Sequence, residues 1–263
     1  MPHIMNIFRL FLFEVIFPIT AAGVLFASPA YSGSIATSHF TIEYSGVSEQ
    51  YARLASDSAE RILPRIAKAL GQNMPERITI ILTGSQDRFN ELTAGTLPDW
   101  SAAVAVPGRR IIFSPLAGHK IDMEKILAHE LVHIIIDEAS GDEHVPRWFH
   151  EGCAELFSGE WGLRNELYMA WKVVRGRMMN FDDIQNVFST GSLDAGLAYD
   201  QSMIAVRHLV NRYGRNVLSR ILGSMHDGKD FPGAFLKSTG YLPTEFENEY
   251  FLYLRKQIGR AHV

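Results

Sequence analysis

The run HELVH at residues 129–133 has the residue types and the spacing of a metal site on a helix. Positions four apart in an α-helix differ by only about 40° around its axis, so the two imidazoles would lie on one face, one turn apart. Two histidines in that arrangement can both reach one zinc ion at about 2.0–2.1 Å. Glu130 lies about 100° round from His129, beside the metal position, where a base for zinc-bound water must be. We therefore predict zinc ligands at His129 and His133 and a general base at Glu130.

The flanking residues predict that this run belongs to a buried helix. Asp122 fits the N-cap, Ile121 and Ile126 occupy the two positions of a hydrophobic staple, and Gly141 offers a stop. Residues 127–136 are apolar almost all round, which is typical of a buried helix. Burying two histidines and a glutamate is costly unless something binds them, which favours a metal site over a core helix with two satisfied histidines.

A second run, PRWFHEGCAELF at residues 146–157, supplies candidates for the third protein ligand that a catalytic zinc needs. Glu151 follows His133 by 18 residues, enough for a turn and a returning helix, and Glu155 lies one helical turn further on the same face. We predict Glu151 as the third ligand. Glu155 would then hydrogen-bond a ligand histidine and fix its tautomer. The reverse assignment of the two glutamates is geometrically open.

Other polar residues near the two runs are weaker candidates. The extended pattern HExxHxxGxxH needs Gly and His where this chain has Ile136 and Ala139. Asp137 lies on the site face, and we expect it to be an ordinary polar residue near a helix end. His144 and His150 are expected to be loop or surface histidines.

The remaining pattern predicts an α+β fold in one domain over residues 39–258. Alternating apolar residues indicate strands, and apolar residues at helical spacing indicate helices. The expected elements, in order, are a strand at 39–44, a helix at 47–70, a strand at 77–83, a helix at 85–94, and hairpin arms at 102–106 and 110–114. Pro64 should kink the first helix and Gly71 should end it. From about Asp122 onward the chain reads as helical, so a small sheet with helices precedes a mainly helical half.

The two runs resemble the gluzincin clan of zinc metallopeptidases. HELVH followed by PRWFHEGCAELFSG is similar to the peptidase MA-like group of small exported bacterial proteins, whose pattern is HELxH and then P-x-W-x-x-EG-x-A-E. The segments HFTIEY, RITIIL, PGRRIIFSP, AYDQS and RYG keep that family's order, so the resemblance covers roughly residues 39–255. It implies a zincin-like fold, Glu151 as third zinc ligand, and a peptide or protein substrate.

Two positions depart from the family pattern. His150 and Cys153 stand where the family often has Ser and an apolar residue. On a helix Cys153 lies about 200° from Glu151, so we expect its thiol to face the core and not the metal.

Peptide hydrolysis also needs a donor for the oxyanion that develops at the scissile carbonyl. In gluzincins this donor is often a Tyr or His from the helical half, and Tyr199 in AYDQS is the best candidate here. The alternative is a packed aromatic residue whose hydroxyl is satisfied locally. Tyr168 and His208 are lesser candidates.

Residues 1–30 form a separate segment with no charge after Glu14. Ser28 and Ala30 occupy the −3 and −1 positions for cleavage before Tyr31, and cleavage after Ser32 fits as well. We predict a secretory signal peptide and therefore an exported chain, periplasmic or secreted. The alternative is an uncleaved membrane anchor at residues 4–28, and only then would the chain contact a membrane.

Composition excludes several other classes of protein. The 263 residues are 47% hydrophobic with a net charge of −4, so the chain is neither disordered nor a broad basic surface for nucleic acid. The single cysteine excludes an intrachain disulfide framework. We predict an exported zinc-dependent endopeptidase; the alternative is a non-catalytic protein of the same fold that keeps zinc for stability or to capture a partner. Glu130 discriminates between the two, since a structural zinc site has no use for an adjacent base.

Overall fold

A computed structural model describes residues 32–94, 103–106, 110–113, 122–141, 143–159, 178–190 and 195–261. The predicted signal segment, Tyr168, Ile121 and the turn of the predicted hairpin at 107–109 lie outside the described residues. In the part of the chain that is described, no helix is both long enough and apolar enough to cross a membrane.

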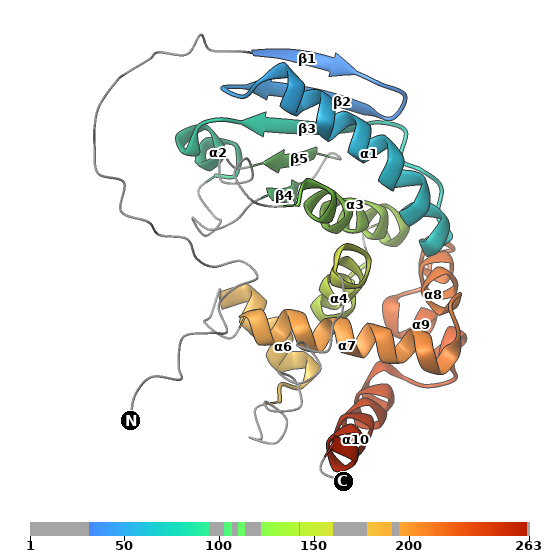
Figure 1. Ribbon diagram of the computed structural model, residues 1–263. Coiled ribbons are helices and arrows are strands. Elements are labelled where there is room, and N and C mark those ends of the chain that lie inside the picture. The colour runs from blue at the N-terminus through green and yellow to red at the C-terminus, as the bar shows by residue number, and fades with distance from the viewer. Residues whose placement is uncertain are drawn as a thin grey trace, which may run out of the picture.

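One sheet occupies the N-terminal half of the described chain (Figure 1). Its strands are β1 (Ser32–Ala36), β2 (Phe40–Ser45), β3 (Ile78–Thr83), β4 (Ala103–Val106) and β5 (Arg110–Phe113). They lie in the order β1-β2-β3-β5-β4; the central three are parallel, and each edge strand is antiparallel to its neighbour. The pairing of β4 with β5 matches the predicted hairpin arms. β1 was not predicted, because its sequence SGSIA holds a single large β-former.

Helices cover the sheet and make up the rest of the described chain. They are α1 (Glu49–Leu70), α2 (Gln86–Leu92), α3 (Met123–Ser140), α4 (Arg147–Ser158), α6 (Phe181–Thr190), α7 (Ala195–Tyr213), α8 (Val217–His226), α9 (Phe231–Thr239) and α10 (Pro243–Ala261). The α+β class, with a small N-terminal sheet and a mainly helical C-terminal half, is therefore confirmed. Figure 1 shows α4 lying between α3 and α7, and it contacts both.

Local capping signals set the ends of the helices that matter for the site. The side chain of Asp122 accepts a hydrogen bond from the backbone N–H of Glu124 and so caps α3, and Gly141 ends that helix with a φ of 59°. Gly71 ends α1 in the left-handed region, as predicted. Pro64 lies inside α1 without ending it, and ten residues of this helix are buried. The predicted kink stays a prediction.

Aromatic packing fixes α4 in the core. Trp148 is 2% exposed and stacks on Phe181 with ring centroids 4.2 Å apart. Burying a side chain of this size stabilises the fold by about 1.5–3 kcal/mol. Phe149 and Cys153 are also fully buried. They lie about 160–200° from Glu151 around the helix axis, so the cysteine faces the core as predicted and the glutamate faces α3.

Gly152 allows α4 and α7 to approach closely. A Cβ at this position would lie 2.3 Å from the backbone oxygen of Ser202 and 2.6 Å from Cγ2 of Val206, both on α7. Backbone does not move aside as a flexible side-chain end does, so the glycine is required. The same close contact brings the N-terminal turns of α7, which carry Tyr199, next to the site helices.

Candidate metal centre

Helices α3 and α4 bring His129, His133 and Glu151 together. Oε2 of Glu151 lies 3.6 Å from Nε2 of His129 and 3.5 Å from Nε2 of His133. Potential ligand atoms of the three residues all lie within 4.8 Å of one another. The two histidine rings meet edge to face, with centroids 4.7 Å apart, and Nε2 of each ring faces Oε2 of Glu151. The residues that the sequence nominates as metal ligands thus converge.

Glu151 carries a buried oxygen that needs a partner. Its Oε1 accepts a hydrogen bond from Nη1 of Arg147 at 2.9 Å. Its Oε2 has no hydrogen-bond partner among the described residues, because both histidine nitrogens lie beyond hydrogen-bonding distance. An unsatisfied buried carboxylate oxygen is costly unless a cation joins it. Two imidazole nitrogens and a carboxylate oxygen are ligands that zinc takes, with the fourth position left for water, so these residues fit a zinc ion.

Glu130 lies beside this cluster and is held by the sheet. Its Oε2 accepts a hydrogen bond from the backbone N–H of Ala105 on the edge strand β4, at 2.6 Å. Burial raises the pKa of Glu130, and His129 and the Ala105 amide partly offset that rise. A carboxyl whose pKa is moved toward neutrality suits a general base. The contact with β4 was not predicted, since it depends on how the sheet packs on α3.

Glu155 approaches the other side of His129. Its Oε1 lies 3.5 Å from Nδ1 of His129, the ring nitrogen that faces away from Glu151. Glu151 faces the Nε2 atoms of both histidines, whereas Glu155 faces one histidine only, through Nδ1. This arrangement favours Glu151 as ligand and Glu155 as the residue that orients His129, the first of the two assignments left open by the sequence.

The cluster attracts positive charge. Burial by itself lowers the pKa of His129, but the carboxylates of Glu151, Glu130 and Glu155 raise it to about 9. Burial raises the pKa of Glu151, but His133 and His129 together lower it to about 2. The pKa of His133 stays well below its ordinary value because of burial. Without a metal the acidic groups therefore hold a proton on one histidine, and a divalent cation would take the place of that charge.

Tyr199 lies on α7 at the edge of the cluster. Its ring centroid is 6.4 Å from that of His129, and its ring meets that of Phe188 edge to face at 4.8 Å. Burial raises the pKa of Tyr199, and the nearby Glu151 and Glu155 add to that rise. A phenol that stays protonated can donate a hydrogen bond. Tyr199 as oxyanion donor therefore stays a prediction, and a packed tyrosine with a locally satisfied hydroxyl stays the alternative.

Of the two lesser candidates for the oxyanion donor, His208 is engaged elsewhere. Its Nε2 lies 3.5 Å from Oε1 of Glu249 on α10, and its ring stacks on Tyr253 with centroids 4.1 Å apart. Tyr168 lies outside the described residues.

The expectation for His150 was wrong. It lies inside α4, is 9% exposed, and is neither a loop nor a surface residue. Its Nδ1 lies 2.7 Å from Nδ1 of His133, and its Nε2 lies 2.9 Å from Oδ1 of Asp137. Asp137, expected to be an ordinary polar residue, therefore also has a partner in this network. The sequence spacing could have indicated this network, since Asp137 lies one helical turn beyond His133 on the same face of α3. His144 is exposed in a loop, as expected.

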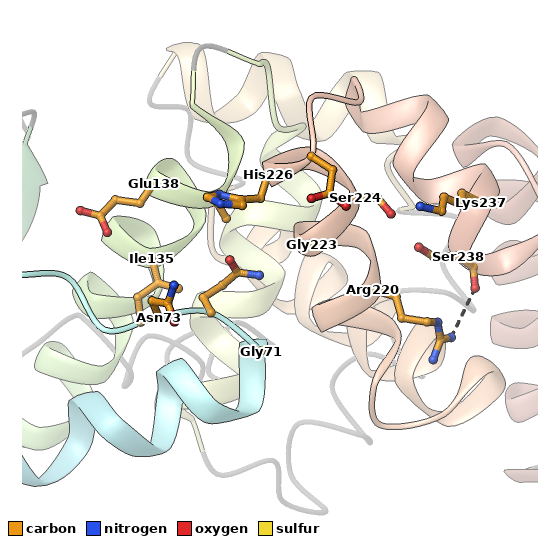
Figure 2. Close-up of a pocket in the computed structure, with 13 residues that line it drawn as sticks. Gly71, Asn73, Ile135, Glu138, Arg220, Gly223, Ser224, His226, Lys237 and Ser238 are labelled. Atoms are coloured by element: carbon orange, nitrogen blue, oxygen red, sulfur yellow. Dashed lines mark hydrogen bonds between the residues drawn. The ribbon is translucent and has the colours of Figure 1, made fainter.

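A separate cavity of about 710 Å³ lies between α3, α8 and α9. Ile135 and Glu138 of α3 line it together with His226 and Lys237, as Figure 2 shows. None of the candidate site residues contributes to it, so the metal cluster and this cavity are distinct.

The α+β fold brings together a His-His-Glu cluster that fits a zinc ion. The family model of the Peptidase MA superfamily matches residues 58–255, and the chain belongs to this superfamily. This finding confirms the resemblance stated above.

Two solved structures are similar at low identity. A variant of a two-domain M1 zinc metallopeptidase bound to L-arginine is 14% identical, with 88% of this chain and 52% of that chain covered and a TM-score of 0.43. The M1 zinc metallopeptidase from Deinococcus radiodurans is 16% identical, with 88% and 51% covered and a TM-score of 0.41. The chain spans about half the length of these two proteins. No curated protein matches it.

Proposed function

We propose that this chain is a zinc-dependent peptidase of the gluzincin type that cleaves within peptide or protein substrates. The observation that carries the proposal is the unpaired, buried Oε2 of Glu151, which faces Nε2 of both His129 and His133. Glu130, beside this point and not part of the ligand set, supports a catalytic use over a purely structural one. Membership of the Peptidase MA superfamily supports the same conclusion.

With zinc held by His129, His133 and Glu151, the other residues of the site would each have a separate role in peptide hydrolysis. When bound, zinc supplies Lewis-acid polarisation of the scissile carbonyl and acidifies water. Glu130 takes the proton of the attacking water and passes it to the leaving amine. The Tyr199 hydroxyl donates a hydrogen bond to the oxyanion. Glu155 places a carboxylate oxygen 3.5 Å from Nδ1 of His129, which favours a hydrogen on that nitrogen and so leaves Nε2 as a lone pair.

The edge strand β4 gives the base its position and offers a place for substrate. Ala105 on β4 donates its N–H to Glu130. β4 is the last strand of the sheet, so the edge that faces away from β5 has no strand beside it among the described residues. Extended peptides add to such edges, and a peptide there would lie next to Glu130.

We also propose that the chain is exported after removal of residues 1–30 and that 39–258 fold as one domain. β1 begins at Ser32, so cleavage before Tyr31 leaves that strand whole, whereas cleavage after Ser32 removes its first residue. N-terminal sequencing of the protein from the periplasmic or secreted fraction tests this. An intact Met1 in the membrane fraction would favour the anchor.

The decisive experiment compares Glu130→Gln with wild type in the zinc-loaded mature chain, using a peptide library as substrate. We expect Glu130→Gln to keep zinc and to lose about 10²–10⁴-fold in cleavage rate, because an amide cannot accept the water's proton. Glu124→Gln is the matched control, since Glu124 lies on α3 in a surface ion pair with Arg61. Equal cleavage by Glu130→Gln and wild type would contradict the base assignment. Zinc binding without any cleavage by wild type would favour the scaffold alternative.

A further inference from the structure

We propose that His150 and Asp137 fix the tautomer and orientation of His133, so that His133 presents Nε2 to the metal. His150 is thus a positioning residue that acts through His133, and Asp137 acts through His150. The inference rests on the proposed zinc site, and it assigns a role to two residues that the sequence left without one.

Hydrogen-bond accounting gives the tautomers. The Asp137 carboxylate can only accept, so the nitrogen 2.9 Å from it, Nε2 of His150, carries a hydrogen. A neutral His150 with hydrogen on Nε2 has a lone pair on Nδ1. That lone pair faces Nδ1 of His133 at 2.7 Å, a contact that needs one hydrogen between the two atoms. The hydrogen therefore belongs to His133, whose Nε2 is left as a lone pair directed at Glu151.

The opposite tautomer would disable the ligand. If Nδ1 of His150 carried a hydrogen, Nδ1 of His133 would have to accept it. Neutral His133 would then carry its own hydrogen on Nε2, and a protonated nitrogen cannot coordinate zinc. The Asp137 carboxylate selects against the neutral form of this arrangement, because that form would place a lone pair of His150 Nε2 against a carboxylate oxygen. In an imidazolium form of His150 both ring nitrogens carry hydrogen, and the tautomer spectra described below distinguish that form from the proposed one.

The rings of His133 and His150 pack against each other where α3 meets α4. The rings of His133 and His150 are nearly parallel, with an interplanar angle of 11° and centroids 4.5 Å apart. His150 is buried within α4, whereas the Asp137 side chain is 69% exposed. Asp137 and His133 lie one turn apart on α3, so the network runs from α3 to α4 and back. It therefore also fixes how His133 lies relative to Glu151, which follows His150 directly.

The two ligand histidines are thus oriented in different ways. Nδ1 of His129 meets a carboxylate directly, at 3.5 Å from Glu155. Nδ1 of His133 meets a carboxylate through an intervening imidazole, with both contacts shorter than 3 Å. Partners of this kind typically change metal affinity or activity by about 10–100-fold.

The first test measures zinc dissociation constants by chelator competition on the mature chain. His150→Leu removes the acceptor, and we expect zinc to bind about 10–100-fold more weakly. His150→Asn places an amide oxygen near the former Nδ1, and we expect affinity close to wild type. Asp137→Ala should weaken zinc binding by about 10-fold, the lower end of that range. Glu124→Gln, which removes a charge from the same helix, should bind zinc as tightly as wild type.

Outcomes of that test separate the inference from the proposed function. Wild type that binds no zinc contradicts the proposed function itself. Zinc-binding wild type with equal affinity in His150→Leu overturns only the inference. Equal losses in His150→Leu and His150→Asn also overturn it, since packing and not the acceptor would then be at work.

The second test reads the tautomer directly and does not depend on any variant folding. Two-bond ¹H–¹⁵N correlation spectra of the zinc-loaded wild type report which ring nitrogen of each histidine carries hydrogen. We expect His150 to be neutral with hydrogen on Nε2, and His133 to carry hydrogen on Nδ1. Hydrogen on Nδ1 of His150 would overturn the inference.

Discussion

Two clusters in this molecule each place a histidine about 3.5 Å from a glutamate. One is the metal cluster of His129, His133 and Glu151 on α3 and α4. The other, which we term the α7–α10 cluster, consists of His208, Arg212 and Tyr213 on α7 and Glu249 on α10. Each joins side chains from two different helices, and a pattern of residue types alone would not tell the two clusters apart.

The clusters differ in how the carboxylate is satisfied. Oε1 of Glu249 accepts a hydrogen bond from Nε of Arg212 at 2.8 Å, and Oε2 accepts one from the Tyr213 hydroxyl at 3.1 Å. Its charge is thus balanced inside the protein. Glu151 has one oxygen on Arg147 and leaves the other facing two histidine nitrogens. The comparison teaches that an unpaired acceptor, and not the presence of histidine and glutamate together, marks the place for a cation.

The histidines respond accordingly. Burial lowers the pKa of His208, and the single nearby carboxylate of Glu249, itself paired with Arg212, only partly offsets this. Three carboxylates raise the pKa of His129 to about 9 despite its burial. The metal cluster therefore holds excess negative charge that the α7–α10 cluster lacks.

The largest expected effect is on zinc content. His133→Ala removes a ligand and should abolish near-stoichiometric zinc binding, whereas His208→Gln should leave zinc unchanged because Glu249 has no unpaired oxygen to offer. Elemental analysis of protein purified without chelator checks both variants. Equal zinc loss in the two variants, or wild type without zinc, would contradict the claim that the metal cluster binds zinc and the α7–α10 cluster does not.

A smaller effect is expected from removing one hydroxyl in each region. Tyr199→Phe should lower kcat by about 10²–10³-fold, the usual cost of one oxyanion donor, and should leave zinc content unchanged. Tyr253→Phe makes the same change on a ring that stacks on His208, and it should alter neither quantity. Steady-state kinetics and zinc analysis on both proteins decide. A Tyr199→Phe enzyme with the kcat of wild type would make Tyr199 a packing residue only.

Local signals in the sequence were sufficient for much of the fold. The caps at Asp122 and Gly141, the stop at Gly71 and the alternation in β2 and β3 act within a few residues, so they were predicted correctly. Helical spacing predicted that His129 and His133 share one face of α3 and that Glu151 lies on the facing side of α4, so their proximity was also predicted. The contacts of Glu130 with β4 and of His150 with Asp137 were not predicted, because they depend on where separate elements cross. The spacing of apolar residues along the chain does not indicate where α3 meets β4 or α4.

The smallest expected effect is on the pH dependence of the free energy of unfolding, and it tests the α7–α10 cluster through His208. The folded-state pKa of His208 lies below its unfolded value, because burial disfavours the imidazolium and Arg212 adds to this, while Glu249 partly opposes it. The unfolded chain therefore binds more protons at this residue, and stability rises with pH through that window. The contribution of His208 to the free energy of unfolding is fully present above the unfolded pKa of about 6.5, and it is lost as the pH falls toward the folded value.

His208→Gln removes this proton linkage, so the wild type should lose more stability than the variant between about pH 7.5 and 5.5. Urea unfolding of both proteins in zinc-free buffer measures the difference, since every other titrating group is common to them and cancels. A variant whose stability falls as steeply as that of wild type would contradict this account of His208.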